Sequence, residues 1–496
     1  MRRAKIVSTL GPSTSTPDSI RELVAAGMDV ARLNLSHGDY PVHEANYASV
    51  RAASDATGHA VGVLVDLQGP KIRTGRFADG PITLTPGDHF TITTRDVPGD
   101  HEVVGTTYPG LAGDVSAGDT ILVDDGKITL AVHDVDETDV RCVVVYGGPL
   151  SDNKGINLPG AAVSAPALSD KDEQDLRWAL GLRADYIALS FVRSAADIGR
   201  VHEIMDEVGV RLPVIAKIEK PQAVDALEEI IDAFDGIMVA RGDLGVELPL
   251  EEVPLVQKRA VEMCRQKAKP VIVATQVLES MIDNSRPTRA EASDAANAVL
   301  DGADALMLSG ETAVGKFPIE VIKTMSKIIE ATEEEGLNRM RALMAPPTTQ
   351  GGVIAATAAE AGEALGVKYL IAFTQLGGSA RRLAQVRSGL PMLAFSPVQD
   401  TRSQLSLVWG MQTFLTGPVT HTDQYALQVD EQLLDLGWCQ EGDRVVIVAG
   451  SPPGVPGSTN AMRVHRIGDA RNQTTVAYAE DASYTSPEGG LPGGMG

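Results

Sequence analysis

Short apolar runs rich in β-branched residues alternate along this chain with stretches of helical periodicity. Eight of these runs are predicted to be strands, at residues 5–9, 30–33, 61–66, 186–191, 214–218, 236–240, 271–275 and 305–309. Helical patterns follow most of them, as at residues 19–26, 195–208, 222–234, 254–266, 289–300 and 319–335. Such alternation predicts parallel strands joined by helical crossovers. The eight units predict an α/β fold, a (β/α)₈ TIM barrel with its functional site at the carboxyl ends of the strands.

The alternation is interrupted between residues 70 and 166, where the helical pattern disappears. Short alternating runs, punctuated by Gly, Pro, Thr and Asp, lie at residues 82–84, 89–94, 120–123, 127–132 and 140–146. This spacing predicts a small all-β domain. Because it leaves the barrel at the strand end that faces the site, we expect a mobile lid. The barrel itself is then expected in two parts, residues 1–69 and 167–342.

A further α/β domain is predicted at residues 343–470, after a linker at residues 345–352 that contains Pro and Gly. Helices are expected near residues 353–365 and 380–385, and strands at residues 369–373, 392–396, 412–415 and 445–449. The Gly-rich end, residues 471–496, has no periodicity and is expected to be a flexible tail.

Composition and charge narrow the possible partners. The net charge of −23 disfavours nucleic acid, because an acidic surface repels phosphate backbones. No apolar run is long enough to span a membrane, and the first residues lack the apolar core of a signal peptide. The scattered Cys142, Cys264 and Cys439 fit neither a disulfide framework nor a zinc site. We therefore expect a cytoplasmic protein with no membrane partner.

Polar residues gather where the predicted strands end. The run at residues 214–218 delivers Lys217 and Glu219, and the next run delivers Asp243. Carboxylates suit Mg²⁺ or Mn²⁺, and a lysine beside them suits a phosphorylated or carboxylated substrate. A single acid would more often cap a helix or pair with a lysine, but two acids at neighbouring strand ends favour a metal site. The other polar residues at predicted strand ends are Thr9, Asn34, Ser36, His37, Asp66, Ser190, Thr275 and Ser309.

Two arginines are candidate phosphate contacts. Arg32 is flanked by apolar residues in its strand and is expected to point inward, whereas Arg73 follows the third strand in a turn and is equally consistent with an exposed loop position. Thr275 can orient a substrate carboxylate or pass a proton; the alternative is a helix N-cap. His37 is not assigned to catalysis, because a lone histidine more often caps or packs.

The ordered motifs of the chain are similar to those of the pyruvate kinase family, up to about Gly468. The matching segments are residues 5–12, 32–38, 66–75, 154–160, 215–219, 238–247, 274–281, 285–291 and 307–313. The resemblance implies transfer of the phosphoryl group of phosphoenolpyruvate to ADP, giving pyruvate and ATP in the last step of glycolysis. It also implies a homotetramer.

The resemblance assigns a role to each site residue. Glu219 and Asp243 would hold Mg²⁺ or Mn²⁺, and Lys217 would neutralise the phosphoryl group in transfer. Thr275, or a water chain reaching Ser309, would protonate the enolate. The residues implied to bind phosphoenolpyruvate are Arg32, Lys217, Gly242, Asp243 and Thr275. Those implied to contact the nucleotide are Asn34, His37, Arg73 and Lys154, the last from the lid.

The turn after residue 66 departs from the pattern of K⁺-dependent family members. Leu67 and Lys71 occupy positions where those members carry threonine and glutamate. The oxygens of Asn34, Ser36 and Asp66 remain, but one ligand is lost and Lys71 brings an ammonium group. We therefore expect activity that does not require K⁺, as in the lysine-bearing branch of the family.

The C-terminal domain resembles the regulatory domain of the family, with a loop suited to a phosphorylated allosteric effector. Gln375 stands where some fructose-bisphosphate-responsive members carry lysine, so the identity of the effector stays open. An ordinary loop with solvated arginines is the alternative. The predicted effector loop consists of Thr374, Gly377, Gly378, Ser379, Arg381 and Arg382.

Two other functions share part of this pattern. A metal-dependent lyase acting on a pyruvate enolate would use the same carboxylates but has no use for the lid or for Lys154. A non-catalytic phosphoenolpyruvate sensor would be expected to have lost Lys217 or a metal-binding acid, and all three residues are present.

Overall fold

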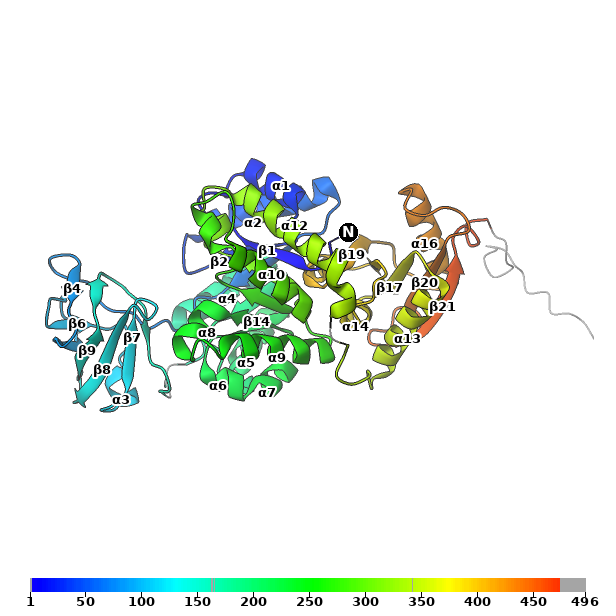
Figure 1. Ribbon diagram of the computed structural model, residues 1–496. Coiled ribbons are helices and arrows are strands. Elements are labelled where there is room, and N and C mark those ends of the chain that lie inside the picture. Colours follow the sequence, from blue (N-terminus) through cyan, green and yellow to red (C-terminus); the bar gives the residue numbers. More distant parts are fainter. Residues whose placement is uncertain (1, 162–163, 165, 341, 473–496) are drawn as a thin grey trace, which may run out of the picture. The chain divides into compact units, whose positions relative to one another are not determined.

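The computed structural model describes residues 2–161, 164, 166–340 and 342–472 (Figure 1). The chain divides into two compact units, which are treated separately below. The first comprises Met1–Pro346, Ala384–Arg387 and Gln399–Thr413, and the second Pro347–Leu383, Ser388–Val398 and Phe414–Gly496. Most of the predicted tail, from residue 473 onward, lies outside the described residues.

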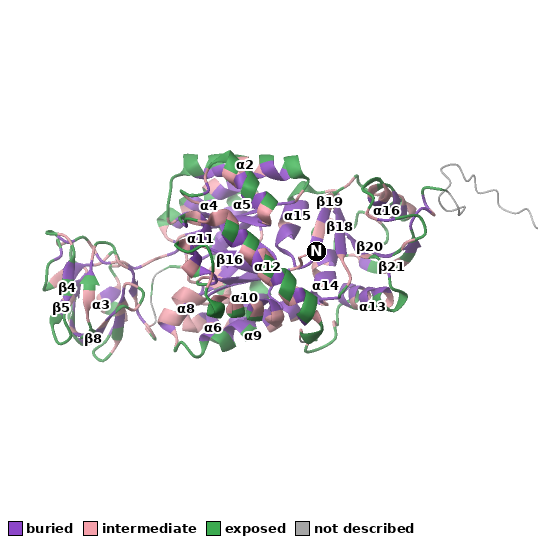
Figure 2. Ribbon diagram, turned by 45° about the horizontal axis from the view of Figure 1, so that its top comes forward, coloured by how far each residue is buried: buried purple, intermediate pink, exposed green. Residues whose placement is uncertain are grey.

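The first unit contains, within the described residues, a closed barrel of eight parallel strands. In barrel order these are β1 (Lys5–Thr9), β2 (Val30–Asn34), β3 (Gly62–Asp66), β12 (Tyr186–Leu189), β13 (Val214–Ile218), β14 (Gly236–Ala240), β15 (Val271–Ala274) and β16 (Ala305–Leu308). The predicted (β/α)₈ barrel is confirmed. Its strands are almost entirely buried, which explains why each one appears in the sequence as a continuous apolar run (Figure 2).

Three strands end earlier than predicted. Strand β12 stops at Leu189 rather than at residue 191, β15 stops at Ala274 rather than at residue 275, and β16 stops at Leu308 rather than at residue 309. Phe191 has φ +55° and Thr275 has φ +66°. These left-handed conformations are incompatible with a strand, and hydropathy does not encode them. Both residues lie at the mouth of the barrel.

Helices follow the barrel strands along the chain. They are α1 (Pro17–Ala26), α2 (Tyr40–Thr57), α4 (Asp170–Leu182), α5 (Ile198–Val208), α6 (Pro221–Asp225), α7 (Leu227–Ala233), α8 (Arg241–Glu247), α9 (Val253–Gln266), α10 (Arg289–Asp301), α11 (Gly310–Ala313) and α12 (Pro318–Gly336). The single helix expected at residues 222–234 is wrong, because Ala226 interrupts it with ψ +19°. Sequence analysis missed α2, whose buried face includes His43, Asn46 and Ser54 and so lacks a clear apolar stripe.

The interruption of the barrel folds as a small β domain with its own core, built around residues such as Phe90, Ile92 and Leu130. Its sheet has the order β11 (Ile156–Asn157), β7 (Thr120–Val123), β8 (Ile128–Val135), β9 (Asp139–Tyr146), β5 (His89–Thr93) and β6 (Val103–Gly105). A two-stranded sheet pairs β4 (Ile82–Leu84) with β10 (Gly148–Leu150), and α3 spans Leu111–Asp114. The missed strands β6, β10 and β11 are too short to show alternation.

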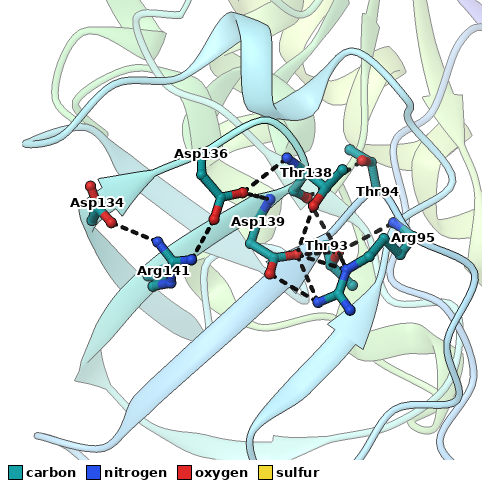
Figure 3. A network of polar contacts seen from close by, with 8 residues as sticks. All are labelled: Thr93, Thr94, Arg95, Asp134, Asp136, Thr138, Asp139 and Arg141. Carbon is teal, nitrogen blue, oxygen red and sulfur yellow. Dashed lines mark hydrogen bonds and ion pairs between the residues drawn. The ribbon is translucent and has the colours of Figure 1, made fainter.

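A polar network closes the end of the β8–β9 hairpin in this domain (Figure 3). The Asp139 carboxylate accepts a hydrogen bond from the Thr93 hydroxyl at 2.5 Å and is paired with Arg95 at 2.9 Å. Arg141 is paired with both Asp134 and Asp136 across the turn. These contacts tie β5, β8 and β9 together at the hairpin end.

The second unit is an α/β layer. Its sheet has the order β19 (Met411–Leu415), β18 (Met392–Ser396), β17 (Tyr369–Phe373), β20 (Arg444–Gly450) and β21 (Thr459–Arg466), the last running antiparallel to β20. The accompanying helices are α13 (Gln350–Leu365), α14 (Gly378–Gln385) and α16 (Asp423–Asp435). The linker expected at residues 345–352 is shorter than predicted, since α13 begins at Gln350 with Thr349 as its N-cap.

Two later segments, residues 384–387 and 399–413, pack with the barrel although they follow it in sequence. The second contains α15 (Gln399–Gln404), and Leu407 after it joins the apolar cluster of Val7, Val30 and Leu64 inside the barrel. No helix in the described part of the chain is long and apolar enough to cross a membrane.

Candidate active site

The carboxyl ends of β13 and β14 bring the central candidates together. The two strands pair in parallel, with Lys217 opposite Met238. Glu219 follows β13 directly, and α8 starts directly after β14, so that Gly242 and Asp243 lie in its first turn. The predicted convergence of a lysine and two acids therefore rests on two neighbouring strands of one barrel.

The Lys217 ammonium lies between three oxygen-bearing side chains. Its Nζ donates to the Ser190 hydroxyl at 2.7 Å and lies 3.0 Å from Glu219 Oε1 and 3.4 Å from Asp66 Oδ1. Burial disfavours its charge, but the neighbouring carboxylates of Asp66 and Glu219 outweigh burial and hold the pKa of Lys217 above its ordinary value. Lys217 is therefore a permanent cation at the barrel mouth.

Asp66 orients two cations at once. Arg32 Nε donates to Asp66 Oδ2 at 2.7 Å, and Arg32 Nη1 donates to the Thr9 hydroxyl at 3.0 Å. Burial opposes ionisation of Asp66, but Lys217 and Arg32 together lower the pKa of this carboxyl below its ordinary value. Arg32 does point inward, as its apolar flanks predict, and it lies beside Lys217 through this shared carboxylate.

Glu219 is a buried carboxylate in an incompletely neutralised site. Its Oε2 accepts a hydrogen bond from the backbone N–H of Phe191 at 2.7 Å, which the left-handed conformation of Phe191 makes available. Burial raises the pKa of Glu219, Lys217 lowers it, and repulsion from Asp243 raises it again. A divalent cation between the two acids would relieve that repulsion.

The donor set fits Mg²⁺ or Mn²⁺. Among the described residues, no cluster of three or more His, Cys, Asp or Glu side chains is arranged to hold a metal. A site with Glu219 and Asp243 alone leaves most coordination positions to substrate and water, which is the usual way in which proteins bind Mg²⁺.

Thr275 is locked beside the start of α8. Its hydroxyl donates to the Ala274 carbonyl at 2.6 Å and accepts a hydrogen bond from the Gly242 N–H at 2.7 Å. Arg241 Nη2 donates to the Thr275 carbonyl at 2.9 Å, and Arg241 Nη1 lies 2.6 Å from Asp294. Thr275 and Gly242 therefore form a common polar surface. Thr275 follows β15, but the N–H group that donates to it belongs to α8, the helix that follows the neighbouring strand β14.

Ser309 lies at the end of β16, where its backbone N–H donates to the buried Glu311 carboxylate at 2.6 Å. Glu311 also accepts from the Leu278 N–H at 3.2 Å. Burial raises the pKa of Glu311, while these backbone N–H groups act against it. This carboxylate joins the loops after β15 and β16 and so fixes Ser309 relative to Thr275.

The candidate nucleotide contacts are divided between two places. The Asn34 amide oxygen accepts from the Ser36 N–H at 3.2 Å, and the His37 N–H donates to the Asn34 carbonyl, which organises the turn after β2. Arg73 donates to the Asn153 carbonyl at 3.1 Å, and Lys154 is paired with Asp124 at 2.9 Å. These contacts of Arg73 and Lys154 lie within the β domain, so no contact joins them to Lys217 among the described residues.

The turn after β3 is anchored to the same site. Leu67 is buried and its carbonyl accepts a hydrogen bond from the Ser190 hydroxyl at 2.8 Å, the same hydroxyl that receives Lys217. Lys71 is half-buried and lines a cavity of about 40 Å³ together with Asp243 and Asn157.

Two family models match the chain. The model described as pyruvate kinase, barrel domain, matches residues 1–322, and the model described as pyruvate kinase, alpha/beta domain, matches residues 353–465. The chain belongs to the pyruvate kinase family. It is therefore a phosphotransferase, and the family resemblance of its motifs is confirmed. Members of this family generally depend on a divalent metal.

Similar pyruvate kinases come from several bacteria. A pyruvate kinase from Mycobacterium intracellulare is 61% identical over 94% of this chain and 99% of its own length. One from Corynebacterium glutamicum is 58% identical over 94% of this chain and 98% of its own length. A solved structure of a pyruvate kinase from Cryptosporidium parvum has a TM-score of 0.88 at 34% identity, covering 94% of this chain and 96% of the other.

Several residues of the site were not assigned roles from the sequence. Arg241 precedes the Gly242–Asp243 pair at a strand end, which was a usable signal. The backbone of Phe191, the carboxylate of Glu311 and the Lys220–Glu247 pair act through contacts between distant segments. No local pattern distinguishes those residues.

The second unit contains a cavity of about 250 Å³ at the predicted effector loop. The hydroxyl of Ser379 lies 2.6 Å from that of Thr459, and Gly377 has φ +79°. The cavity is lined by Thr374, Gln375, Gly378, Ser379, Arg381 and Arg382 among others. Hydroxyls and arginines around one cavity are suited to a phosphorylated ligand.

Proposed function

We propose that the barrel mouth transfers the phosphoryl group of phosphoenolpyruvate to ADP, giving pyruvate and ATP in the last step of glycolysis. The cluster of Lys217, Arg32 and Asp66 next to Glu219 carries this proposal, since two buried cations share one mouth with a metal-binding carboxylate. Phosphoryl transfer needs mainly positioned positive charge around the moving group. The ATP formed from phosphoenolpyruvate, ADP and Mg²⁺ tests the proposal, and a purified enzyme that forms none refutes it.

The residues divide the reaction between them. Lys217 binds the phosphoryl oxygens as the bond to the enolate oxygen breaks and the bond to the ADP oxygen forms. Arg32 holds the same phosphoryl group from the neighbouring strand, with Asp66 orienting both cations. Gly242 and Thr275 seat the substrate carboxylate. The enolate then takes a proton on its terminal carbon from Thr275 or from a water chain that reaches Ser309.

Glu219 and Asp243 are proposed to hold the divalent metal, Mg²⁺ or Mn²⁺. The metal, when bound, neutralises negative charge on the substrate carboxylate and phosphoryl group. The repulsion between the two acids supports this assignment.

The nucleotide is proposed to bind between the barrel and the β domain acting as a lid. Asn34 and His37 belong to the turn after β2, and Arg73 and Lys154 belong to the β domain. Closure of the lid would bring the second pair to the ADP phosphates and exclude water from the reacting group. Lys154→Ala is expected to raise the KM for ADP more than that for phosphoenolpyruvate, and the reverse pattern would contradict the assignment.

The activity is proposed to be independent of K⁺. Leu67 is buried and offers no side-chain ligand, while Lys71 lines the cavity that Asp243 also borders and brings a positive charge to this turn. The site of Asn34, Ser36 and Asp66 would then receive its monovalent positive charge from the protein itself. Turnover in K⁺ is expected to equal turnover in choline at equal ionic strength, and strong activation by K⁺ would refute the proposal.

A phosphorylated metabolite is proposed to regulate the enzyme through the 250 Å³ cavity. The hydroxyls of Thr374 and Ser379 and the charges of Arg381 and Arg382 support an anionic ligand. Arg382→Ala is expected to abolish activation by a panel of sugar and nucleoside monophosphates without lowering basal turnover. Unchanged activation would contradict this site.

The enzyme is further proposed to be a cytoplasmic homotetramer. Its three cysteines are free and buried, which suits a reducing compartment. Light scattering after size exclusion is expected to give four times the chain mass of 52.3 kDa. A monomer at micromolar concentration would contradict the tetramer.

A further inference from the structure

Lys220 lies beside the two chain segments that connect the barrel with the β domain, which together are called the hinge below. It follows Glu219 directly in the sequence. With Asp243 and Arg193, it lines the cavity of about 40 Å³ that both connections border. The outgoing connection contributes residues 70–72 to this cavity, and the returning connection contributes residues 156–158.

On the returning side, Lys220 is joined to the chain through Glu247. The Lys220 ammonium is paired with Glu247 Oε1, and the same oxygen accepts a hydrogen bond from the Asn157 amide at 2.9 Å. The side chains of Lys220 and Glu247 are 15% and 2% exposed, so this pair is largely removed from water. Glu247 lies one helical turn after Asp243 in α8, and the contact therefore connects the return strand β11 to the helix that carries Asp243.

On the outgoing side, Lys220 is joined to the chain through Phe191. Its ammonium lies 5.6 Å from the centre of the Phe191 ring. The ring packs against Gly69, where a Cβ atom would lie 2.7 Å from Phe191 Cδ2. The backbone N–H of Phe191 donates to Glu219 Oε2 at 2.7 Å. The Lys220 ammonium thus contacts Glu247 on the returning side and Phe191 on the outgoing side. Glu247 lies in the same helix as Asp243, and the backbone of Phe191 binds Glu219.

We infer that Lys220, with Glu247 and Asn157, forms a clasp that positions the metal-binding carboxylates and couples them to the hinge of the β domain. In this role Lys220 is a positioning residue, which holds the end of β13 and helix α8 at a set separation. Because Asn157 shares the Glu247 oxygen, movement of the hinge changes the support of Asp243. The inference rests on the proposed assignment of Glu219 and Asp243 to the metal.

The direct test is a Mn²⁺ titration of the full chain without substrate, with free Mn²⁺ followed by electron paramagnetic resonance. Lys220→Met is expected to weaken Mn²⁺ binding about 10-fold, as loss of a residue that orients metal ligands typically does. Lys267→Met is the matched control, because Lys267 forms an exposed ion pair with Asp232 at 2.8 Å on the same barrel. Its Mn²⁺ affinity is expected to equal that of the wild type. A Lys220→Met protein that binds Mn²⁺ within twofold of the wild type would overturn the inference.

A second variant separates positioning from folding. Lys220→Met alone leaves the Glu247 carboxylate buried without its cation, which destabilises the fold. The double variant Lys220→Met/Glu247→Gln removes both charges and is expected to recover the melting temperature while Mn²⁺ binding stays weak. Recovery of Mn²⁺ affinity together with stability would show a purely structural pair and overturn the inference.

The hinge part of the clasp is tested by Asn157→Ala. This variant is expected to weaken Mn²⁺ binding about threefold in the wild type and not at all in the Lys220→Met background, because the shared oxygen has then lost its role. Equal effects in both backgrounds would overturn the coupling. ATP formation by the wild type is measured in parallel. Its absence would refute the proposed reaction, whereas the Mn²⁺ titrations alone test the clasp.

Discussion

Replacement of Asp66 by Asn is expected to remove the shared anionic partner of Arg32 and Lys217, although neither cation is itself changed. The Asp66 carboxylate is buried and lies 2.7 Å from Arg32 and 3.4 Å from Lys217. A pair of unit charges at 3.4 Å interacts by about 5 kcal/mol at an effective dielectric constant of about 20. Desolvation offsets part of this energy, and removal of one partner of a buried pair typically costs about 3–5 kcal/mol of stability.

The catalytic effect follows from displacement of Lys217. Without Asp66, the anions that still attract this lysine are Glu219, at 3.0 Å, and Asp243, so we expect its ammonium to move toward the proposed metal site and away from Arg32. A displacement of about 1 Å at a reacting centre lowers the rate about 100-fold. Asp66→Asn is therefore expected to lower kcat about 100-fold and the melting temperature by several degrees.

The assay is luciferase-coupled ATP formation at saturating phosphoenolpyruvate, ADP and Mg²⁺, with the melting temperature measured on the same preparation. Asp232→Asn serves as the control, since its pair with Lys267 is exposed and contributes little. A folded Asp66→Asn protein with kcat within threefold of the wild type would refute the role assigned to this carboxylate.

Three further predictions concern the rest of the fold. Burial lowers the pKa of His43, so the folded state binds fewer protons than the unfolded chain below about pH 6.5; the stability that His43 contributes is full above that pH and is lost as the pH falls. The fall in melting temperature in acid is expected to be smaller in His43→Gln, and an unchanged fall would contradict the role given to His43. Burial raises the pKa of the Cys142 thiol to about 12 and that of Cys439 to about 11, so Ellman's reagent at pH 8 is expected to label none of the three cysteines before denaturation, and rapid labelling of the native protein would contradict their burial. Gly69→Ala is expected to destabilise the protein by about 1 kcal/mol or more, because Gly69 has φ +74° and an added Cβ would meet the Phe191 ring, and an unchanged melting temperature would contradict that packing.

Hydropathy was sufficient to predict the barrel because buried parallel strands must be apolar on both faces. Strand β13 with Lys217 and strand β14 before Asp243 were both found in this way, and the carboxyl-end rule then placed their polar residues at one mouth. Helix α2 was missed for the complementary reason, since its buried side chains include His43 and Asn46 and carry no apolar period.

The pairing of charges within the site was beyond sequence reasoning. Which carboxylate neutralises which cation depends on distances between strands, and Asp66 proved to serve both Arg32 and Lys217. Backbone strain was equally invisible, as the left-handed Phe191 and Thr275 show. The packing of residues 399–413 with the barrel is a long-range tertiary contact that no local sequence pattern predicts.

The central claim is that Lys217 acts on the moving phosphoryl group while Glu219 and Asp243 bind the metal. The most direct test measures ATP formation and Mn²⁺ binding on one preparation of Lys217→Met. ATP formation is expected to fall about 10³-fold or more, with Mn²⁺ affinity close to that of the wild type. Undiminished ATP formation would contradict the account, and loss of Mn²⁺ binding would show that the lysine and the metal site are not separate.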